Sequence, residues 1–314
     1  MIGEDGTVEA LLSPKVDFVF KRIFGTEDNR DVLLAFLNAI FEDSEQPLVD
    51  SVEILNPFVE KDALTDKMSV LDVKARTAAG MLIDIEIQVR DHQDMAKRTL
   101  FYWSQLFQQQ LKVGDDYHQL HKTVTVNVLD FTALPDTPYH STFHLHEDRT
   151  GRLLTDLLEV HYIELRKLYA QSLGLERRLV RWMLFLTTQT RERLEELAMA
   201  DPALKKALTT LEWLSQDAHT RELYEARQKG LMTYQADLAG AREQGRQEGR
   251  AEGREEGREE GRAEGREEGR AEGAQRKAVE VARYLLTRGI AVDEVAQATG
   301  LPVTDIAALT RTLP

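Results

Sequence analysis

The chain of 314 residues contains no cysteine. Disulfide bonds and thiolate metal sites are therefore both excluded. No apolar run approaches the roughly 20 residues that a membrane-spanning helix needs. The opening residues, Met1–Gly6, are acidic and lack the apolar segment of a secretory signal. Because 42% of the residues are hydrophobic and 30% are charged, we expect a soluble cytoplasmic protein with a real core and no membrane contact.

Positive charge is also scarce, since 40 Lys and Arg stand against 54 Asp and Glu, a net charge of −14. Phosphate contacts dominate nucleic-acid affinity, so this balance counts against DNA binding by the chain as a whole. Part of the excess comes from residues 243–273, whose 11 Glu and 7 Arg contribute −4. A metal-dependent active site is itself locally acidic. Contact with DNA must therefore come from local basic patches or from a metal ion.

The stretch 71–88 has the pattern of a β-hairpin. Polar and apolar residues alternate in both halves, which is the period of strands with one buried face. Ala78–Gly80 would form a three-residue loop, with Gly80 in the left-handed conformation that such loops need. Counting outward from this loop places Asp72 opposite Glu86.

Asp72 and Glu86 would then lie side by side, with Cβ atoms about 4.5–5.5 Å apart. Asp84 adds a third acid on the same face, with Gln88 beside it. Neighbouring carboxylates repel one another unless a cation lies between them or one keeps its proton. Hard oxygen ligands of this kind suit Mg²⁺ or Mn²⁺. The pattern is also that of an ordinary polar face on a half-exposed sheet, so the spacing alone leaves both interpretations open.

The elements around this hairpin predict an α/β core of restriction-endonuclease type. A helix carrying Asp17 and Lys21 comes first, and these two residues have the i,i+4 spacing of a surface ion pair. The following helix, strand region, hairpin, amphipathic helix and three strands are expected at 31–41, 49–59, 71–88, 91–111, 123–131, 143–147 and 158–165. Residues 173–237 have a helical pattern, with Asp201 before Pro202 as an N-cap.

Two motifs allow a functional and a structural interpretation. The aromatic run 101–103 is favoured as core packing over a base-stacking platform, because such platforms usually lie on exposed strands. His144 and His146 alternate on one strand face and could ligate a metal ion. With no third ligand in view, we interpret them as ordinary surface histidines.

Residues 243–273 form a tandem four-residue repeat with Gly at every fourth position. The repeat has no large apolar residue with which to build a core, and each Gly costs a helix about 0.5–1 kcal/mol relative to Ala. We expect a flexible or partly helical tether, and a glycine stripe that lets two helices approach in a homodimer is the alternative. The tail has a helix-turn-helix rhythm, but its last helix, 303–311, offers only Arg311 as a base. We favour self-association or protein interaction for the tail over sequence-specific DNA binding.

Five phrases, in order, carry a resemblance to a known family. They are DFVFKRIFG, LDVKA, DIEIQ, RTLFYW and VNVLDF, at 17–25, 71–75, 84–88, 98–103 and 126–131. On these phrases the chain resembles the Rpn family of recombination-promoting nucleases, which are PD-(D/E)xK nuclease family transposases. Asp72 followed by Glu86, Ile87 and Gln88 is similar to the E-x-Q form of the PD-(D/E)xK motif.

The resemblance implies a metal-dependent endonuclease in which Asp72 and Glu86 hold Mg²⁺ or Mn²⁺ and Ile87 adds its backbone carbonyl. Gln88 stands where the wider superfamily usually has Lys. It can orient the attacking water but has no titratable proton. Either the metal ion lowers the pKa of the water sufficiently, or a lysine arrives from elsewhere. Lys74 is one such candidate, because it shares the face of Asp72.

The resemblance also places the first helix beside the active site, which makes Asp17 a secondary catalytic candidate and Lys21 a second possible lysine. It implies DNA as the substrate and a role in recombination, mobile DNA or host defence, and we expect low sequence specificity because the chain has no base-reading element. The alternative is a non-catalytic transposase-like protein that assembles through the repeat and the tail. A transcriptional regulator is the least favoured. The expected nuclease-like domain, helical subdomain, repeat linker and small helical module cover 1–170, 171–240, 241–274 and 275–314.

Overall fold

The computed structural model describes residues 10–55, 73–91, 94–171, 173–188 and 190–311. The chain forms two compact units, one ending at Gln228 and the other beginning at Lys229. Within these described ranges, no helix combines the length and the apolarity that a membrane crossing requires.

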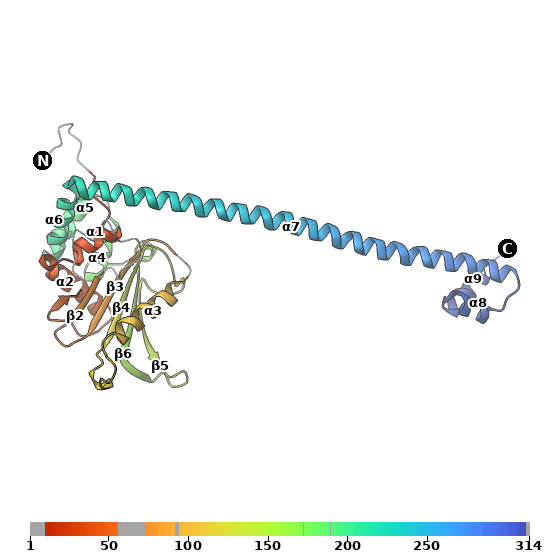
Figure 1. The fold of residues 1–314 in the computed structure, drawn as a ribbon, viewed down its shortest axis with the longest axis horizontal. Coiled ribbons are helices and arrows are strands. Elements are labelled where there is room, and N and C mark those ends of the chain that lie inside the picture. The colour runs from red at the N-terminus through yellow and green to blue at the C-terminus, as the bar shows by residue number, and fades with distance from the viewer. Residues whose placement is uncertain (1–9, 56–72, 92–93, 172, 189, 312–314) are drawn as a thin grey trace, which may run out of the picture. The chain divides into compact units, whose positions relative to one another are not determined.

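The first unit is built on a mixed sheet. In the part of the chain that the structure describes, the sheet has six strands in the order β1-β2-β3-β4-β6-β5 (Figure 1). β3, β4 and β6 run parallel, and the other neighbouring pairs are antiparallel. The strands are β1 (Val52–Ile54), β2 (Val73–Thr77), β3 (Leu82–Gln88), β4 (Thr123–Leu129), β5 (His140–His146) and β6 (Leu153–Glu164). The mixed α/β architecture expected from the sequence is therefore confirmed.

β2 and β3 form the expected hairpin. Gly80 has a φ of +86°, and a Cβ at this position would lie 2.6 Å from the ring of His121. Glycine meets both the conformational and the steric demand here. Lys74 pairs with Asp84 across the hairpin, which is the register expected from the loop. Asp72, one residue before β2, lies outside the described residues.

The two faces of the sheet are covered differently. On one face, α1 (Asp17–Phe24) and α2 (Arg30–Asp43) pack against apolar side chains of the central strands. Those side chains are Ile83, Ile85, Ile87, Val124, Val126 and Val128. On the opposite face lies α3 (Met95–Gln108), whose Thr99 Oγ1 donates to Asn127 Oδ1 at 3.1 Å. The alternating pattern therefore directs the apolar side chains to the core and the polar side chains towards α3.

Three helices after the sheet extend the same apolar core. They are α4 (Arg178–Thr187), α5 (Arg191–Ala200) and α6 (Pro202–Gln216). Trp182 on α4 is fully buried, with its ring 5.6 Å from that of Phe24 and 5.5 Å from that of Phe36. Asp201 accepts a hydrogen bond from the backbone N–H of Ala203 at 2.9 Å, which confirms it as the N-cap of α6. These helices consequently share one core with α1 and α2.

The aromatic run of α3 does not form core. Phe101 is 57% exposed and its neighbour Leu100 is 54% exposed, while Tyr102 and Trp103 are half-buried. The prediction of core packing is therefore wrong for Phe101. A helix that covers one sheet turns only one stripe towards it. The buried side chains of α3 are Met95, Thr99 and Leu106.

The tetrapeptide repeat lies within a continuous helix, α7 (Ala218–Thr287). The sequence predicted a flexible or partly helical tether, and in the structure the repeat is helical throughout. Apolar contacts hold both ends of α7, since Tyr224 packs against the core of the first unit and Ala282 belongs to that of the second. Within the repeat, Arg246 pairs with Glu243 at 2.9 Å, with i,i+3 spacing.

The second unit ends in two short helices, α8 (Val292–Thr299) and α9 (Val303–Thr310). They enclose a small core with the end of α7. Its buried members are Ala282, Val295, Ala296 and Ile306. Gly300 has a φ of +69° at the C-cap of α8, so the helix end that the sequence predicted at this glycine is confirmed.

Candidate active site

Two acids of β3 lie on the face that α3 covers. Asp84 has no exposed surface and Glu86 is only 4% exposed. Both alternate with isoleucines that pack into the core on the other face. The half-exposed polar face that the spacing had left open is therefore not what these two acids form. They are buried carboxylates.

β4 supplies a polar neighbour to each acid. In the parallel register, Thr125 lies beside Asp84 and Asn127 lies beside Glu86. Thr99 of α3 donates to Asn127 and thereby fixes the helix against this row. Along β4, Thr or Asn alternates with Val, and this alternation is the sequence signal that Thr125 and Asn127 share one face of the strand. The sequence does not show which residues of β3 lie beside them, because parallel pairing is set by distant connections.

The protonation of Glu86 is set by its surroundings. Burial raises the pKa of Glu86, whereas a hydrogen bond from Gln88 and the positive charges of Arg98 and Lys74 oppose that rise. The Gln88 amide nitrogen donates to Glu86 Oε2 at 3.2 Å. Arg98 lies on α3, with its guanidinium 5.5 Å from the centre of the Tyr102 ring. Glu86 therefore keeps a raised pKa despite three neighbours that favour its ionised form.

Asp84 is less well compensated. No group in the described ranges hydrogen-bonds to either of its carboxylate oxygens. Burial, and after it the charge of Glu86, raise the pKa of Asp84 well above its ordinary value, and the charge of Lys74 offsets this only in part. An ionised carboxylate buried in this way is strongly destabilising unless a cation or a proton compensates it.

This donor set fits a hard divalent cation. Carboxylate oxygens without partners, next to a second carboxylate, are the ligands that Mg²⁺ and Mn²⁺ prefer. Of the expected metal ligands, Glu86 and Ile87 lie on β3, and Asp72 lies outside the described residues. Among the described residues, no group of three His, Cys, Asp or Glu side chains is placed to hold a metal ion. A three-carboxylate site would therefore need Asp72.

The other candidate residues have different surroundings. Lys74 lies across the strand pair from the acids, and its charge favours the ionised form of both. Asp17 forms an ion pair with Arg227 at the beginning of α7. The end of α1 approaches β2, since a Cβ at Gly25 would lie 3.3 Å from Val73 Cγ2. The structure therefore brings Lys74 to the acids and engages Asp17 in a contact with α7.

Lys15, which no sequence pattern indicated, contacts Asp130 beside the end of β3. The backbone N–H of Asp130 donates to the carbonyl of Gln88 at 2.9 Å. The carboxylate of Asp130 accepts a hydrogen bond from Lys15 Nζ at 2.7 Å. This contact joins residues 115 positions apart, so only the folded chain shows it.

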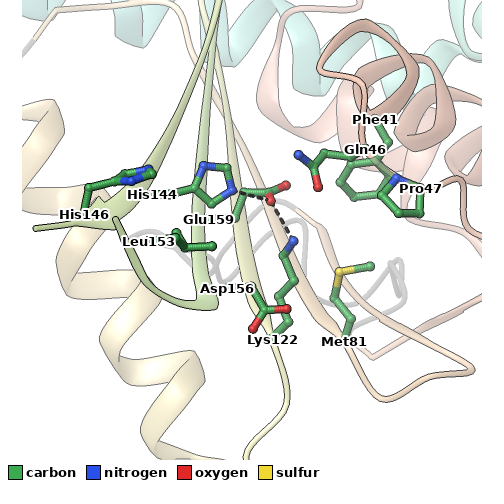
Figure 2. A pocket seen from close by; sticks show the side chains of 10 residues that line it. All are labelled: Phe41, Gln46, Pro47, Met81, Lys122, His144, His146, Leu153, Asp156 and Glu159. Atoms are coloured by element: carbon green, nitrogen blue, oxygen red, sulfur yellow. Dashed lines mark hydrogen bonds and ion pairs between the residues drawn. The ribbon is translucent and has the colours of Figure 1, made fainter. Parts of the chain in front are cut away.

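A second polar cluster lies on the opposite face of the sheet, around Glu159 of β6. Lys122 Nζ lies 2.7 Å and His144 Nε2 lies 2.8 Å from Glu159 Oε2, and His161 Nε2 lies 2.6 Å from Glu159 Oε1. Burial raises the pKa of Glu159, but these three partners outweigh it and hold the pKa at about 2. Figure 2 shows Lys122 and His144 pointing towards this carboxylate in a pocket of about 460 Å³. The interpretation as an ordinary surface histidine is therefore wrong for His144.

The cluster continues through two histidines to α2. His161 Nδ1 lies 2.9 Å from His140 Nε2, and His140 Nδ1 lies 2.8 Å from Asp43 Oδ2. Three hydrogen bonds thus join Glu159, His161, His140 and Asp43, and each needs one proton. Two neutral imidazoles carry only two such protons, so a fully hydrogen-bonded series needs one more. Burial lowers the pKa of His161.

Comparison with known proteins identifies the family. No curated protein and no solved structure matches the chain significantly. The family described as PD-(D/E)XK nuclease family transposase matches residues 14–241. This match covers more than half of the chain and includes the β2–β3 hairpin with its acids, and it confirms the resemblance carried by the five phrases. The chain therefore belongs to the PD-(D/E)XK nuclease family transposases.

Proposed function

We propose that this protein is a metal-dependent DNA endonuclease that hydrolyses phosphodiester bonds with low sequence specificity. The observation that carries the proposal is the buried acid face of the family's hairpin, where Glu86 accepts a hydrogen bond from Gln88 and lies on the same face as Asp84. Membership of a nuclease family supports this chemistry.

Asp72, Glu86 and the backbone carbonyl of Ile87 would hold the metal ion. When bound, Mg²⁺ or Mn²⁺ supplies Lewis-acid activation of the attacking water and of the phosphate. Gln88 uses its amide N–H on Glu86, which leaves its side-chain carbonyl to accept a hydrogen bond from the water. Gln88 therefore orients the water without taking its proton. Lys74 favours the ionised carboxylates that a metal ion requires.

Local positive charge would attract DNA to this site. The chain as a whole carries −14, so the metal ion and the nearby cations, Arg98 and Lys74, would attract the phosphate. We expect low sequence specificity because the charged side chains that α9 and its C-cap could present to a DNA groove are Asp305 and Arg311. We place the activity in the cytoplasm, in recombination, mobile-element or defence processes.

Plasmid nicking tests this function. Supercoiled plasmid is incubated with the purified full chain and Mg²⁺ or Mn²⁺, beside Asp72→Ala, Glu86→Ala and Asp94→Ala. Asp94 is an exposed acid at the beginning of α3 and serves as the matched control. We expect nicking by wild type and Asp94→Ala, loss of about 100-fold or more in the other two, and none with EDTA. Equal cutting by all variants would assign the activity to another site.

A non-catalytic interaction protein is the second candidate. Gln88 in place of the usual Lys and the net charge of −14 favour it, as does the exposure of the repeat along α7. Self-association would then proceed through the repeat and the terminal helices. Absence of nicking with every divalent metal, together with absence of metal binding, would favour this function.

A further inference from the structure

Asp84 is a fully buried acid of the candidate active site to which the proposed mechanism assigns no role. We propose that Asp84 is a further cation-binding carboxylate, which contributes an oxygen to the divalent ion held at Glu86. This inference rests on the proposed function and extends the ligand set that the family motif implies.

The strand geometry places Asp84 within reach of the same ion. Asp84 and Glu86 are two residues apart on β3, so they share a face and their Cα atoms are about 6.6 Å apart. Two carboxyl groups at this spacing can converge on one ion, because each side chain extends from the sheet in the same direction. Asn127, beside Glu86, is already bonded to Thr99. In the described part of the chain, the Asp84 carboxylate has no comparable hydrogen bond.

A second observation points to a ligand at this place. Thr125, which lies beside Asp84 in the parallel register, is 2% exposed, and its hydroxyl also has no hydrogen-bond partner among the described residues. Buried polar atoms are almost always paired in folded proteins. Several unpaired atoms on the face that carries Glu86 therefore indicate a shared polar partner, and a hydrated divalent ion suits both carboxylate and hydroxyl oxygens.

Two simpler interpretations of Asp84 make different predictions. A neutral, protonated Asp84 would need an acceptor for its O–H, yet Thr125 is not within hydrogen-bonding distance of it. A purely structural role with Lys74 across the strand pair would stabilise the chain regardless of metal. Only the cation-binding role makes the affinity for a metal ion depend on the Asp84 charge.

The test is Mn²⁺ binding to the full chain, measured by electron paramagnetic resonance of unbound Mn²⁺. The variants are Asp84→Asn, Asp84→Ser and the exposed control Asp94→Asn. Asp84→Asn keeps the side-chain shape and removes the charge, and Asp84→Ser provides a smaller replacement if the amide is not accommodated. We expect both Asp84 variants to bind Mn²⁺ at least about tenfold more weakly than wild type. Asp94→Asn should bind as wild type does.

Thermal unfolding of the same proteins gives a readout independent of nicking. Added Mn²⁺ should raise the unfolding midpoint of wild type more than that of Asp84→Asn, because the variant lacks the carboxylate that would bind the ion. Wild-type Mn²⁺ affinity in both Asp84 variants would overturn this inference and leave the nuclease proposal intact. Absence of Mn²⁺ binding by wild type would overturn both.

Discussion

At the scale of single residues, the proposed mechanism gives the Gln88 side chain two uses. Its N–H donates to Glu86 and lowers the pKa of that carboxyl against the effect of burial. Its carbonyl oxygen would orient water. Metal ions bind the ionised carboxylate, so in the proposed site the first use would extend the range of pH in which metal binds. We propose that a glutamine can stand in place of the usual lysine because it favours the charged form of its neighbour.

Gln88→Leu tests this role through the pH dependence of nicking. Removing the donor raises the pKa of Glu86, so a higher pH is needed to ionise it. The acid limb of the rate profile should move to higher pH, with a loss of about 10- to 100-fold near neutral pH that diminishes as the pH increases. The matched control is Gln108→Leu on the exposed side of α3. A profile lowered equally at every pH would show that Gln88 acts on the water alone.

At the scale of elements, the Glu159 cluster joins three strands. Glu159 and His161 belong to β6, His144 belongs to the edge strand β5, and Lys122 directly precedes β4. The ion pairs therefore reinforce the pairing of β5 and β4 with β6. Removing one member of such a buried group leaves the others without compensation.

Glu159→Gln should destabilise the chain by about 3 kcal/mol at neutral pH, because Lys122, His144 and His161 lose their carboxylate. The pKa of Glu159 is about 2 in the folded chain and 4.5 ordinarily. Its stabilisation is therefore complete above pH 4.5 and is lost as the pH falls towards 2. Urea unfolding should show the difference from wild type shrinking across that window.

The control for this series is Asp156→Asn, an exposed acid on the same strand. It should change stability little at any pH in the window. A constant difference between wild type and Glu159→Gln from pH 4.5 to 2 would contradict the assigned role.

At the scale of the whole molecule, α7 continues from the first unit into the second. Eight glycines recur within it, at 245, 249, 253, 257, 261, 265, 269 and 273. Among the residues that the structure describes, a Cβ at any of them would meet no atom within 4 Å. Contacts among the described residues therefore give no reason for glycine at these positions, and contact with a second copy is the reason we propose.

Replacing Gly253, Gly257 and Gly261 by Ala in the full chain tests that reason. If α7 contacts no second chain, each change should stabilise the helix by about 0.5–1 kcal/mol. Circular dichroism should then show equal or greater helicity on heating. Sedimentation equilibrium on the same samples measures self-association, and Ala251→Gly is the reverse control. Weaker self-association in the alanine variants would show that the glycine face packs against another chain.

Local chemistry was sufficient to predict several features from the sequence alone. The Gly80 turn and the Lys74–Asp84 register follow from residues close together in the chain, and so do the helix ends at Asp201 and Gly300. Of the candidate site, Glu86, Gln88 and Lys74 follow from the same alternation, because a strand of period two places its polar residues on one face. Their roles in catalysis remain predictions.

Contacts between distant residues were decided only by the tertiary structure. Asp84 and Glu86 are buried because α3 docks over them, and Glu159 meets Lys122 because β6 lies parallel to β4. The period of a strand gives its two faces but not what covers each, and parallel neighbours are chosen by connections that carry no local signal. The physical reason is that burial, and with it the raised pKa of each acid, depends on neighbours far along the chain.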